Sequence, residues 1–193
     1  MMFTKQDVVQ FFDEAAPTWD QNEINQSEVI NIILDHAFVA DKNVLDVACG
    51  TGVLFSYYAS RNCSVTALDI SSEMVKIAKE KVKSSSIQVI HNSFEDYESQ
   101  ELFDIVMIFN AFPHFTDYQQ TIKKALSLTK KNGMVSIAHS YSKKQIDDIH
   151  HRKANKISQL LPNTSDLIAM FPKSATLVYE ISNDIMYQVV FRN

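Results

Sequence analysis

The apolar positions along the chain form two kinds of pattern. Short runs rich in Val, Ile and Leu predict buried β-strands, whereas apolar residues that recur every three or four positions predict helices with one buried face. From residue 43 to about residue 140 the two patterns alternate, which indicates a mostly parallel sheet with helices on both faces. The strands expected in this stretch are Asn43–Val47, Ser64–Leu68, Ile87–Ile90, Asp104–Phe109 and Met134–Ala138.

Helices are expected ahead of the first strand, over residues 4–14 and Ser27–Phe38, with Ser27 as the cap of the second. Three later helices begin at residues that can cap a helix N-terminus. The last of these is expected to end before Pro162 and to be followed by a short helix near Asp166–Phe171. The expected caps are Ser71, the pair Thr116 and Gln119, and the pair Ser142 and Gln145.

The C-terminal residues predict two strands that pair with each other. Ala175–Ile181 and Ile185–Phe191 are joined at Ser182-Asn183-Asp184, and strands so close in sequence must run antiparallel. Together with the five earlier strands they predict a seven-stranded, mostly parallel α/β sheet with helices on both faces and a C-terminal antiparallel strand hairpin.

Composition and charge narrow the class of partner. The length of 193 residues suits one domain. The net charge is −5 with scattered Lys and Arg, which argues against nucleic acid, because phosphate backbones need a concentrated basic face. No apolar run approaches the roughly 20 residues of a membrane span, so no membrane is expected as a partner. The only cysteines are Cys49 and Cys63, and no signal peptide is visible, which predicts a cytoplasmic protein.

Two of the three glycines lie together, directly after the first strand. Gly50 and Gly52 allow a turn with positive φ and let a ligand approach the backbone closely. A helical pattern follows the turn, so free backbone N–H groups and a helix N-terminus are aimed at one place, as a polar ligand requires. Asp46 stands inside the strand, where a half-buried strand does not favour a charge. The structural alternative is an ordinary strand-to-helix turn that requires glycine.

The stretch from Asp46 to Gly52 reads D-V-A-C-G-T-G and resembles motif I of the class I, Rossmann-like S-adenosylmethionine-dependent methyltransferases, D-x-G-x-G-x-G. Ala48 stands where that family usually has its first glycine. Residues 11–20 resemble the N-terminal segment of many small-molecule methyltransferases, where an aromatic-Asp pair ends a helix that lies over the cofactor. The resemblance covers about residues 10–140 well and the tail in outline. It implies a single methyltransferase domain over residues 1–193, with a helical lid in residues 1–40 and a Rossmann-like core in residues 41–193.

The resemblance implies that S-adenosylmethionine binds at the carboxyl ends of the strands, where the strand order reverses. Asp46 and nearby carbonyls would hold its ammonium group, and Asp69, at the end of the second strand, would accept both ribose hydroxyls. A cap or turn role before the next helix is the structural alternative for Asp69. The cofactor-binding residues expected from the resemblance are Asp46, Ala48, Gly50, Gly52, Asp69, Ile70, Ser93, Phe94 and Asn110.

The adenine contact departs from the family pattern. After the third strand the family reads G-D-x-x-D, but here Asn92-Ser93 stands in place of Gly-Asp. Ser93, or Asn92 after a shift of one residue, is therefore expected at the adenine edge, together with the N–H group of Phe94. Ile70 would supply an apolar face for the purine.

The candidates for catalysis are histidines. A hydroxyl acceptor needs a base, whereas positioning suffices for a thiol, an amine or a stabilised carbanion. Residues 110–115 resemble the Asn-x-x-x-His segment of small-molecule methyltransferases of the ubiquinone-biosynthesis type and lack the Asn-Pro-Pro-Tyr motif of nucleic-acid and protein N-methyltransferases. His114, His139 and His150 are the candidate bases; Ile149 is expected to face the core, which makes His150 the inward member of the pair with His151. The alternatives are ordinary polar positions, or a metal site, for which no ligand spacing is visible and no metal is expected.

The sequence therefore predicts methyl transfer from S-adenosylmethionine to a small-molecule acceptor, by a monomer or homodimer, with Phe112 and Phe115 as walls of an apolar pocket. Two alternatives stay open: a methyltransferase-like protein that binds S-adenosylmethionine without turnover and, less favoured, an NAD-dependent oxidoreductase. The NAD fingerprint needs a third glycine where this chain has Val53 or Phe55. Cys49, at a helix N-terminus, is expected to have a lowered thiol pKa, although its simpler role is that of a small residue that fills the turn.

Overall fold

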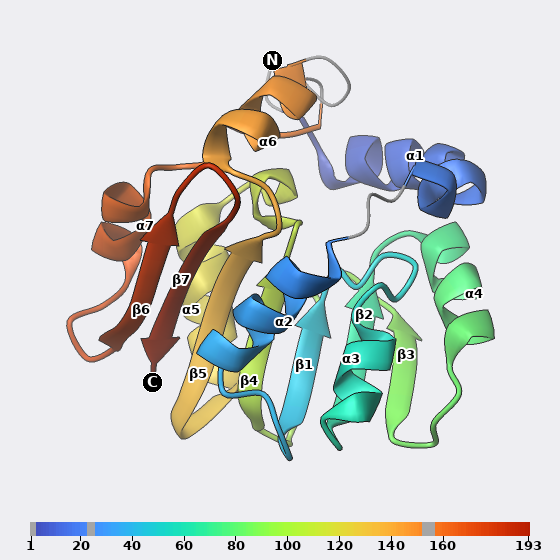
Figure 1. The fold of residues 1–193 in the computed structure, drawn as a ribbon. Helices are drawn as coiled ribbons and strands as arrows, with labels where there is room; N and C mark the ends of the chain where they lie inside the picture. The colour runs from blue at the N-terminus through green and yellow to red at the C-terminus, as the bar shows by residue number, and fades with distance from the viewer. Residues whose placement is uncertain (1–2, 23–25, 152–156) are drawn as a thin grey trace.

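The computed structural model describes residues 3–22, 26–151 and 157–193, which form a single seven-stranded sheet flanked by helices (Figure 1). The strands are Asn43–Val47 (β1), Ser64–Asp69 (β2), Ile87–His91 (β3), Phe103–Phe109 (β4), Thr129–His139 (β5), Thr176–Ser182 (β6) and Tyr187–Arg192 (β7). The helices are Lys5–Ala15 (α1), Ala16–Asn22 (η1), Ser27–His36 (α2), Phe55–Ser60 (α3), Ser72–Lys81 (α4), Phe112–His114 (η2), Tyr118–Leu128 (α5), Lys143–Ile149 (α6) and Thr164–Met170 (α7).

The sheet has the order β3-β2-β1-β4-β5-β7-β6. β1 pairs in parallel with β2 on one side and with β4 on the other, so the strand order reverses at β1. β7 runs antiparallel to both β5 and β6. The predicted fold is confirmed. The reversal at β1 places the ends of β1, β2 and β4 beside one crevice.

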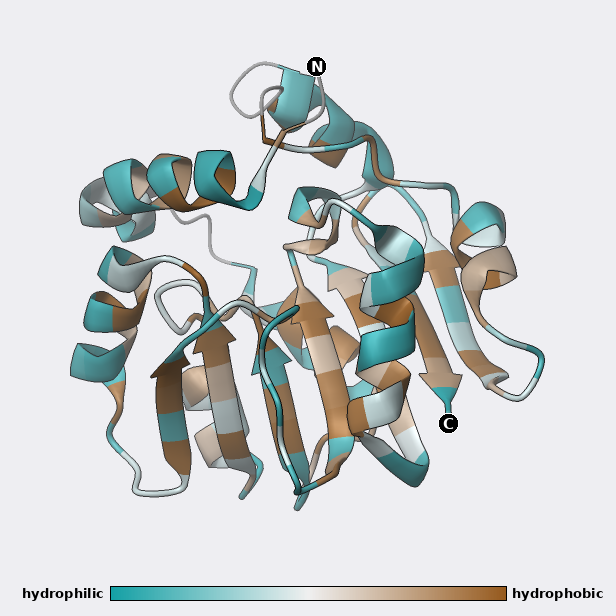
Figure 2. Ribbon diagram, turned by 180° about the vertical axis from the view of Figure 1, so that it is seen from behind, coloured by the Kyte–Doolittle hydropathy of each residue, from teal (hydrophilic) through white to brown (hydrophobic). Residues whose placement is uncertain are grey.

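Two apolar cores lie on opposite faces of the sheet, because successive side chains of a strand point to opposite sides. Ile105 and Met107 of β4 pack with α2, α3 and α4, whereas Val106 and Ile108 pack with α5 and α7. Figure 2 shows the same division: the strands are largely hydrophobic, and the helices turn hydrophilic residues outward. None of the helices in the described ranges combines the length and apolar character that a membrane span requires.

The first helices have two different positions. α1 and η1 lie across the carboxyl-end edge of the parallel strands, next to α4 (Figure 1). α2 instead packs on one face of the sheet, where Ile33 and Leu34 are fully buried in the apolar core. Of the lid expected in residues 1–40, the described part that covers the edge is therefore α1 with η1.

Most expected boundaries agree with the structure, and two caps were wrong. Ser71 and Ser142 cap α4 and α6 as predicted, and Ser142 forms the full capping box with Gln145. α5 is capped by Asp117, which accepts from the Gln120 N–H group, so the predicted cap at Thr116 is one residue early. α2 begins at Ser27, but its cap position is Gln26, whose side chain makes no capping bond.

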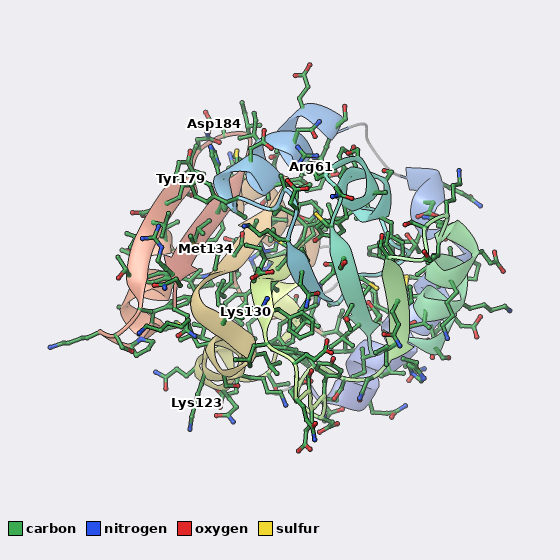
Figure 3. All side chains as sticks on the ribbon, turned by 90° about the horizontal axis from the view of Figure 1, so that it is seen from below. Arg61, Lys123, Lys130, Met134, Tyr179 and Asp184 are labelled. Atoms are coloured by element: carbon green, nitrogen blue, oxygen red, sulfur yellow. The ribbon has the colours of Figure 1, made fainter. Side chains whose placement is uncertain are left out.

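Two segments differ from the pattern more widely. β5 begins at Thr129 rather than Met134. Asn132-Gly133, a pair typical of turns, lies within it, where the pairing with β4 shifts register. Lys130 at this end contacts the Asp104 carboxylate at 2.9 Å (Figure 3). The helix expected to end before Pro162 ends as α6 at Ile149; its expected continuation over residues 152–156 lies outside the described residues.

Candidate functional site

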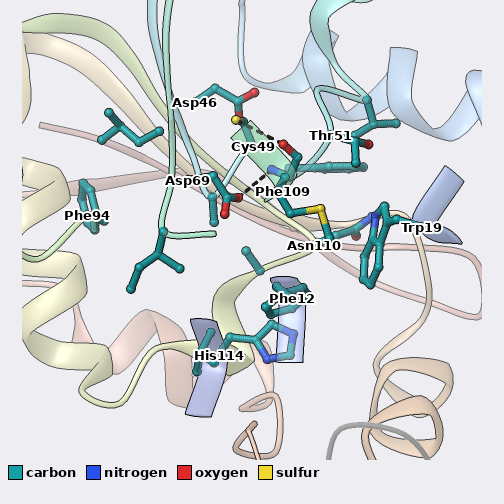
Figure 4. A pocket seen from close by; sticks show the side chains of 18 of the residues that line it. Phe12, Trp19, Asp46, Cys49, Thr51, Asp69, Phe94, Phe109, Asn110 and His114 are labelled. Carbon is teal, nitrogen blue, oxygen red and sulfur yellow. Dashed lines mark hydrogen bonds between the residues drawn. The ribbon is translucent and has the colours of Figure 1, made fainter. Parts of the chain in front are cut away.

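A cavity of about 770 Å³ lies between α1 and the carboxyl ends of the strands. Residues from the loops after β1, β2, β3, β4 and β5 line it, as do side chains of α1 and η1 (Figure 4). The volume lies within the range of about 300–1,000 Å³ that small-molecule and cofactor sites occupy. The position is the one at which open α/β sheets bind ligands.

The turn after β1 holds three residues in the left-handed region: Ala48 at φ 57°, Gly50 at φ 56° and Gly52 at φ 84°. A Cβ atom on Gly52 would lie 2.5 Å from the ring of Phe55, so helix α3 requires glycine there. Ala48 and Gly50 line the cavity, whereas Gly52 lies outside its wall and shapes the turn. Ala48 therefore holds a conformation that an L-residue adopts at a cost of about 1–2 kcal/mol.

Asp46 lies at the floor of the cavity and is only 2 % exposed. Its Oδ2 atom has no hydrogen-bond partner among the described residues. Burial, and then the charge of Asp69, raise the pKa of Asp46 from 3.8 to about 8. A buried polar atom without a partner is costly, so the Oδ2 atom of Asp46 is a candidate contact for a ligand in the cavity.

Asp69 ends β2 and is also buried beside the cavity. Its Oδ2 atom accepts the Gly50 N–H group at 2.8 Å, and its Oδ1 atom accepts the Ser71 N–H group at 2.8 Å. Burial raises the pKa of this carboxyl, and the two N–H groups oppose that shift. Two backbone anchors fix the carboxylate plane, and each oxygen retains a lone pair for a ligand hydroxyl. Ile70, the next residue, lines the cavity as expected.

The loop after β3 presents Asn92, Phe94 and Glu95 to the cavity, but not Ser93. The Ser93 hydroxyl donates to the Asp96 carboxylate at 2.7 Å, away from the cavity. Of the two residues that the sequence left open at the adenine edge, Asn92 is the one on the cavity wall. Ser93 is the first residue of a turn, in which the Asp96 N–H group donates to the Ser93 carbonyl, and serine is common at this position.

Three charged residues of α1 and η1 tie this lid to the three loops. Lys5 contacts Asp96 in the loop after β3 at 2.8 Å. Asp13 accepts the hydroxyl of Ser71, after β2, at 2.6 Å. Asp20 accepts the hydroxyl of Thr51, in the glycine turn after β1, at 2.6 Å, and pairs with Lys81 of α4 at 2.7 Å. The lid is thus fastened separately to each loop at the end of β1, β2 and β3.

The other half of the cavity is formed by residues after β4 and by the lid. Of the two phenylalanines expected as its walls, Phe115 lines the cavity, whereas Phe112 is fully buried behind it. Asn110 and His114 line it, and the His114 ring meets the Phe12 ring edge-on, with centroids 5.0 Å apart (Figure 4). The His114 Nδ1 atom lies 3.0 Å from the carbonyl oxygen of Ile157. A carbonyl only accepts, so Nδ1 carries the proton and Nε2 keeps a lone pair. Burial lowers the pKa of His114 to about 4, which keeps the ring neutral at physiological pH.

His139 and His150 lie behind this wall rather than on it. The ring centroids of His114 and His150 are 5.0 Å apart, but of the three candidate bases only His114 lines the cavity. His139 has no exposed surface, because the last residue of β5 packs against Tyr187 of β7, and neither of its ring nitrogens has a partner among the described residues. His150 is the inward member of its pair and His151 the exposed one, although Ile149 is itself 39 % exposed. The described residues contain no cluster of three or more His, Cys, Asp or Glu placed to hold a metal ion.

Cys49 differs from its expectation. Burial, and then the negative charges of Asp46 and Asp69, raise the pKa of its thiol well above the ordinary value. The expected lowering by a helix N-terminus is absent, since α3 begins only at Phe55. Cys49 is a small buried residue that fills the turn.

Several cavity residues carry no signal in the sequence alone. Gln26 and Ser140 line the cavity and bond to each other across 114 residues of chain. Asp13 and Asp20 belong to a segment whose similarity to known lids was visible, but their partners were not. Such contacts depend on how distant segments pack, which periodicity does not report.

The strand order that reverses at β1, the antiparallel β7 and the two acidic residues beside the glycine turn together define a class I methyltransferase fold. Residues 44–133 match the family model described as "Methyltransferase domain". Residues 44–133 therefore form a methyltransferase domain, and the fold around them is that of the class I, S-adenosylmethionine-dependent enzymes.

Two relatives illustrate the range of the family. A protein of Priestia megaterium named malonyl-[acyl-carrier protein] O-methyltransferase is 28 % identical over 138 residues, which are 68 % of this chain and 50 % of that protein. A protein of Saccharophagus degradans named ubiquinone biosynthesis O-methyltransferase is 31 % identical over 124 residues, 62 % of this chain and 51 % of that protein. The chain spans about half the length of the curated relatives it matches.

Solved structures agree in fold over nearly the whole chain. The N-methyltransferase NodS from Bradyrhizobium japonicum, in complex with S-adenosyl-L-homocysteine, has a TM-score of 0.74 at 16 % identity and covers 98 % of this chain and 97 % of that one. The plantazolicin methyltransferase BpumL has a TM-score of 0.75 at 10 % identity, with coverage of 98 % and 95 %. At such low identity these likenesses concern the fold.

Proposed function

We propose that this protein transfers the methyl group of S-adenosylmethionine to a small-molecule acceptor. The observation that carries the proposal is the unpartnered, buried Oδ2 atom of Asp46 on the floor of the cavity, beside the anchored carboxylate of Asp69. A cation and a pair of hydroxyls would satisfy these two groups, and S-adenosylmethionine carries both. The match of residues 44–133 to a methyltransferase family supports the same assignment.

The cofactor assignment follows the loops in order. Asp46 would hold the ammonium group, because the cation supplies the partner that Oδ2 lacks and lowers the cost of ionising the carboxyl. Asp69 would accept the ribose hydroxyls with its free lone pairs. Ala48 and Gly50 expose the backbone of the turn to the methionine portion, and Gly52 keeps that turn in shape.

The adenine would lie against Ile70 and Phe94, with its polar edge toward Asn92. Asn92 replaces Ser93 in this proposal because its side chain lies on the cavity wall, whereas the Ser93 hydroxyl bonds to Asp96. An amide offers both a donor and an acceptor, which the adenine edge can use.

The acceptor would occupy the half of the cavity that Phe12, His114 and Phe115 enclose. Bound S-adenosylmethionine supplies an electrophilic methyl group on a good leaving group, so the chain's own residues have to exclude water and orient the acceptor. His114 is neutral and presents Nε2 as a proton acceptor, which suits a hydroxyl acceptor. His139 and His150 would support the His114 ring from behind without touching the acceptor. The enclosure beneath α1 favours a small molecule over a folded macromolecule.

Calorimetric titration with S-adenosylhomocysteine, and separately with NADH, tests the cofactor. Binding of S-adenosylhomocysteine alone is expected, and a screen of small phenols, thiols and amines with S-adenosylmethionine then identifies the acceptor. Binding of NADH alone would contradict the proposal. Tight binding of S-adenosylhomocysteine with no methyl transfer to any acceptor would favour a binding protein without turnover.

A further inference from the structure

A chain of hydrogen bonds joins three cavity residues that come from distant parts of the sequence. The Asn110 amide bonds twice to Ser140: Nδ2 donates to the hydroxyl at 3.0 Å, and Oδ1 accepts the backbone N–H at 2.9 Å. Gln26 bonds twice to the other side of Ser140. Its Nε2 donates to the Ser140 carbonyl at 2.7 Å, and its Oε1 accepts the Ser140 hydroxyl. We call these three residues the clamp.

Ser140 is the centre of the clamp and is 1 % exposed. Its N–H group, its carbonyl and both functions of its hydroxyl are all used within the clamp. A buried serine with every polar group paired fixes its partners in one arrangement, since loss of any bond leaves a buried group unsatisfied.

The clamp holds a strained residue. Asn110 has φ 54°, in the left-handed region, immediately after β4. Asparagine tolerates this region better than most residues, but it persists only where the surroundings impose it. The two bonds to Ser140, together with the Asn110 N–H bond to the Ala138 carbonyl at 2.8 Å, impose it here.

The strained turn sets the direction of the acceptor wall. β4 ends at Phe109, and η2 begins at Phe112, so the chain turns into the cavity within the residues between them. His114 is the last residue of η2 and follows that direction. A change at Asn110 therefore displaces the ring that we place beside the acceptor.

Gln26 gives an independent indication. It occupies the cap position of α2, where side chains usually bond to the first turn of the helix, yet it makes no such bond. Both polar ends of its side chain are turned to Ser140 instead. The residue that precedes α2 is thus used to hold the end of β5.

We propose that Gln26 and Ser140 are positioning residues for methyl transfer, acting through the left-handed turn at Asn110 on the acceptor wall. This rests on the proposed function. Misplacement of reacting groups by about 1 Å can lower a rate about 100-fold, so a loosened clamp affects turnover more than cofactor affinity.

The test compares Ser140→Ala and Gln26→Met with two matched controls at exposed positions, Ser127→Ala and Gln88→Met. We expect each clamp variant to lower kcat about 10-fold, with the affinity for S-adenosylhomocysteine close to wild type, and the controls to change neither. Asn110→Gly, which keeps the left-handed turn but removes the amide, should lower kcat by a similar factor. Adding Ser140→Ala to Asn110→Gly should then lower it little further, because the two act through one element.

Amide hydrogen exchange provides a readout that does not depend on turnover. Exchange over residues 110–116 should be faster in Ser140→Ala than in wild type, with residues 44–52 unchanged. An unchanged kcat in folded Ser140→Ala, or losses that multiply in the double variant, would overturn the proposal. If the wild type transfers no methyl group to any acceptor, the proposed function fails. In that case, faster exchange over residues 110–116 in Ser140→Ala would still show that the clamp holds the turn. Unchanged exchange in that variant would refute the clamp as well.

Discussion

Asp46 and Asp69 lie near the carboxyl ends of two adjacent parallel strands, where burial, and then the negative charge of Asp69, raise the pKa of Asp46 to about 8. Both carboxyl groups are buried, but among the described residues Asp69 accepts from the N–H groups of Gly50 and Ser71, whereas the Oδ2 atom of Asp46 has no partner. The two acids therefore differ in the donors that the protein supplies to them. In the proposed function, Asp69 accepts the ribose hydroxyls, and a cation takes the place of the proton on Asp46.

The contribution of Asp46 to stability without ligand should fall as pH rises from about 4 to about 8. The pKa of Asp46 is about 8 in the folded state and 3.8 ordinarily, so the folded state binds more protons over this interval. The resulting slope for a single group approaches about 1.4 kcal/mol per pH unit. Asp46→Asn should remove this contribution, and urea unfolding of both proteins at several pH values measures it. A stability difference that does not vary with pH would refute the raised pKa.

Asp69→Ala should weaken binding of S-adenosylhomocysteine by about 1–3 kcal/mol or more, because the ribose hydroxyls lose their acceptors. Calorimetric titration measures the affinity. The exposed variant Glu98→Ala serves as the control for a lost carboxylate. Unchanged affinity in folded Asp69→Ala would remove Asp69 from the ribose site.

Ala48→Gly should stabilise the protein by about 0.5–1 kcal/mol. The left-handed φ of 57° is strained for alanine, and the relief exceeds the extra chain entropy that glycine loses on folding. Thermal or urea unfolding measures the change. Ala59→Gly, in the exposed face of α3, is the matched control and should destabilise instead. A destabilised Ala48→Gly would show that the methyl group makes packing contacts that outweigh the strain.

His139→Leu should raise stability by about 1–3 kcal/mol near neutral pH, because it removes two buried nitrogens that lack partners among the described residues. Burial lowers the pKa of His139 to about 3, so wild-type stability is lost as pH falls below about 6.5, and the variant should resist acid better. Urea unfolding at pH 7 and pH 5 tests both statements. A destabilised variant would mean that the nitrogens are satisfied by water in solution.

His114→Gln should lower kcat about 100-fold or more for a hydroxyl acceptor and leave the affinity for S-adenosylhomocysteine unchanged. The same substitution at the exposed His151 is the control and should change neither. The pH profile separates this role from a structural one: wild-type kcat should fall at low pH as His114 takes up a proton, near its pKa of about 4. Full activity of His114→Gln on a hydroxyl acceptor would exclude His114 as the base.

The sequence predicts the strands and the glycine turn well because both depend on local signals. The apolar run of β1 and the glycines that follow it are contiguous. The early start of β5 was missed because Asn132-Gly133 is typical of a turn, and only the pairing with β4 shows that these residues lie within the strand.

Most of the residues expected at the cofactor line the cavity, whereas two of the three candidate bases lie behind its wall. Ser93 and Asn92 are adjacent, and which of them faces the cavity depends on the bonds that Ser93 makes with Asp96 and Lys5. His139 ends a strand as expected, but its burial depends on β7, which arrives from the far end of the chain. Contacts of this kind are set by tertiary packing, so the pattern of a single segment does not reveal them.

One element, α1 with η1, touches both halves of the cavity. Lys5, Asp13 and Asp20 fasten it to the loops after β3, β2 and β1, while Phe12 lies against His114 on the acceptor side. A ligand in one half that shifts this element would therefore change the surface that a second ligand meets in the other half. Thermodynamic linkage makes such an effect reciprocal: the factor by which the first ligand strengthens the second equals the factor by which the second retains the first.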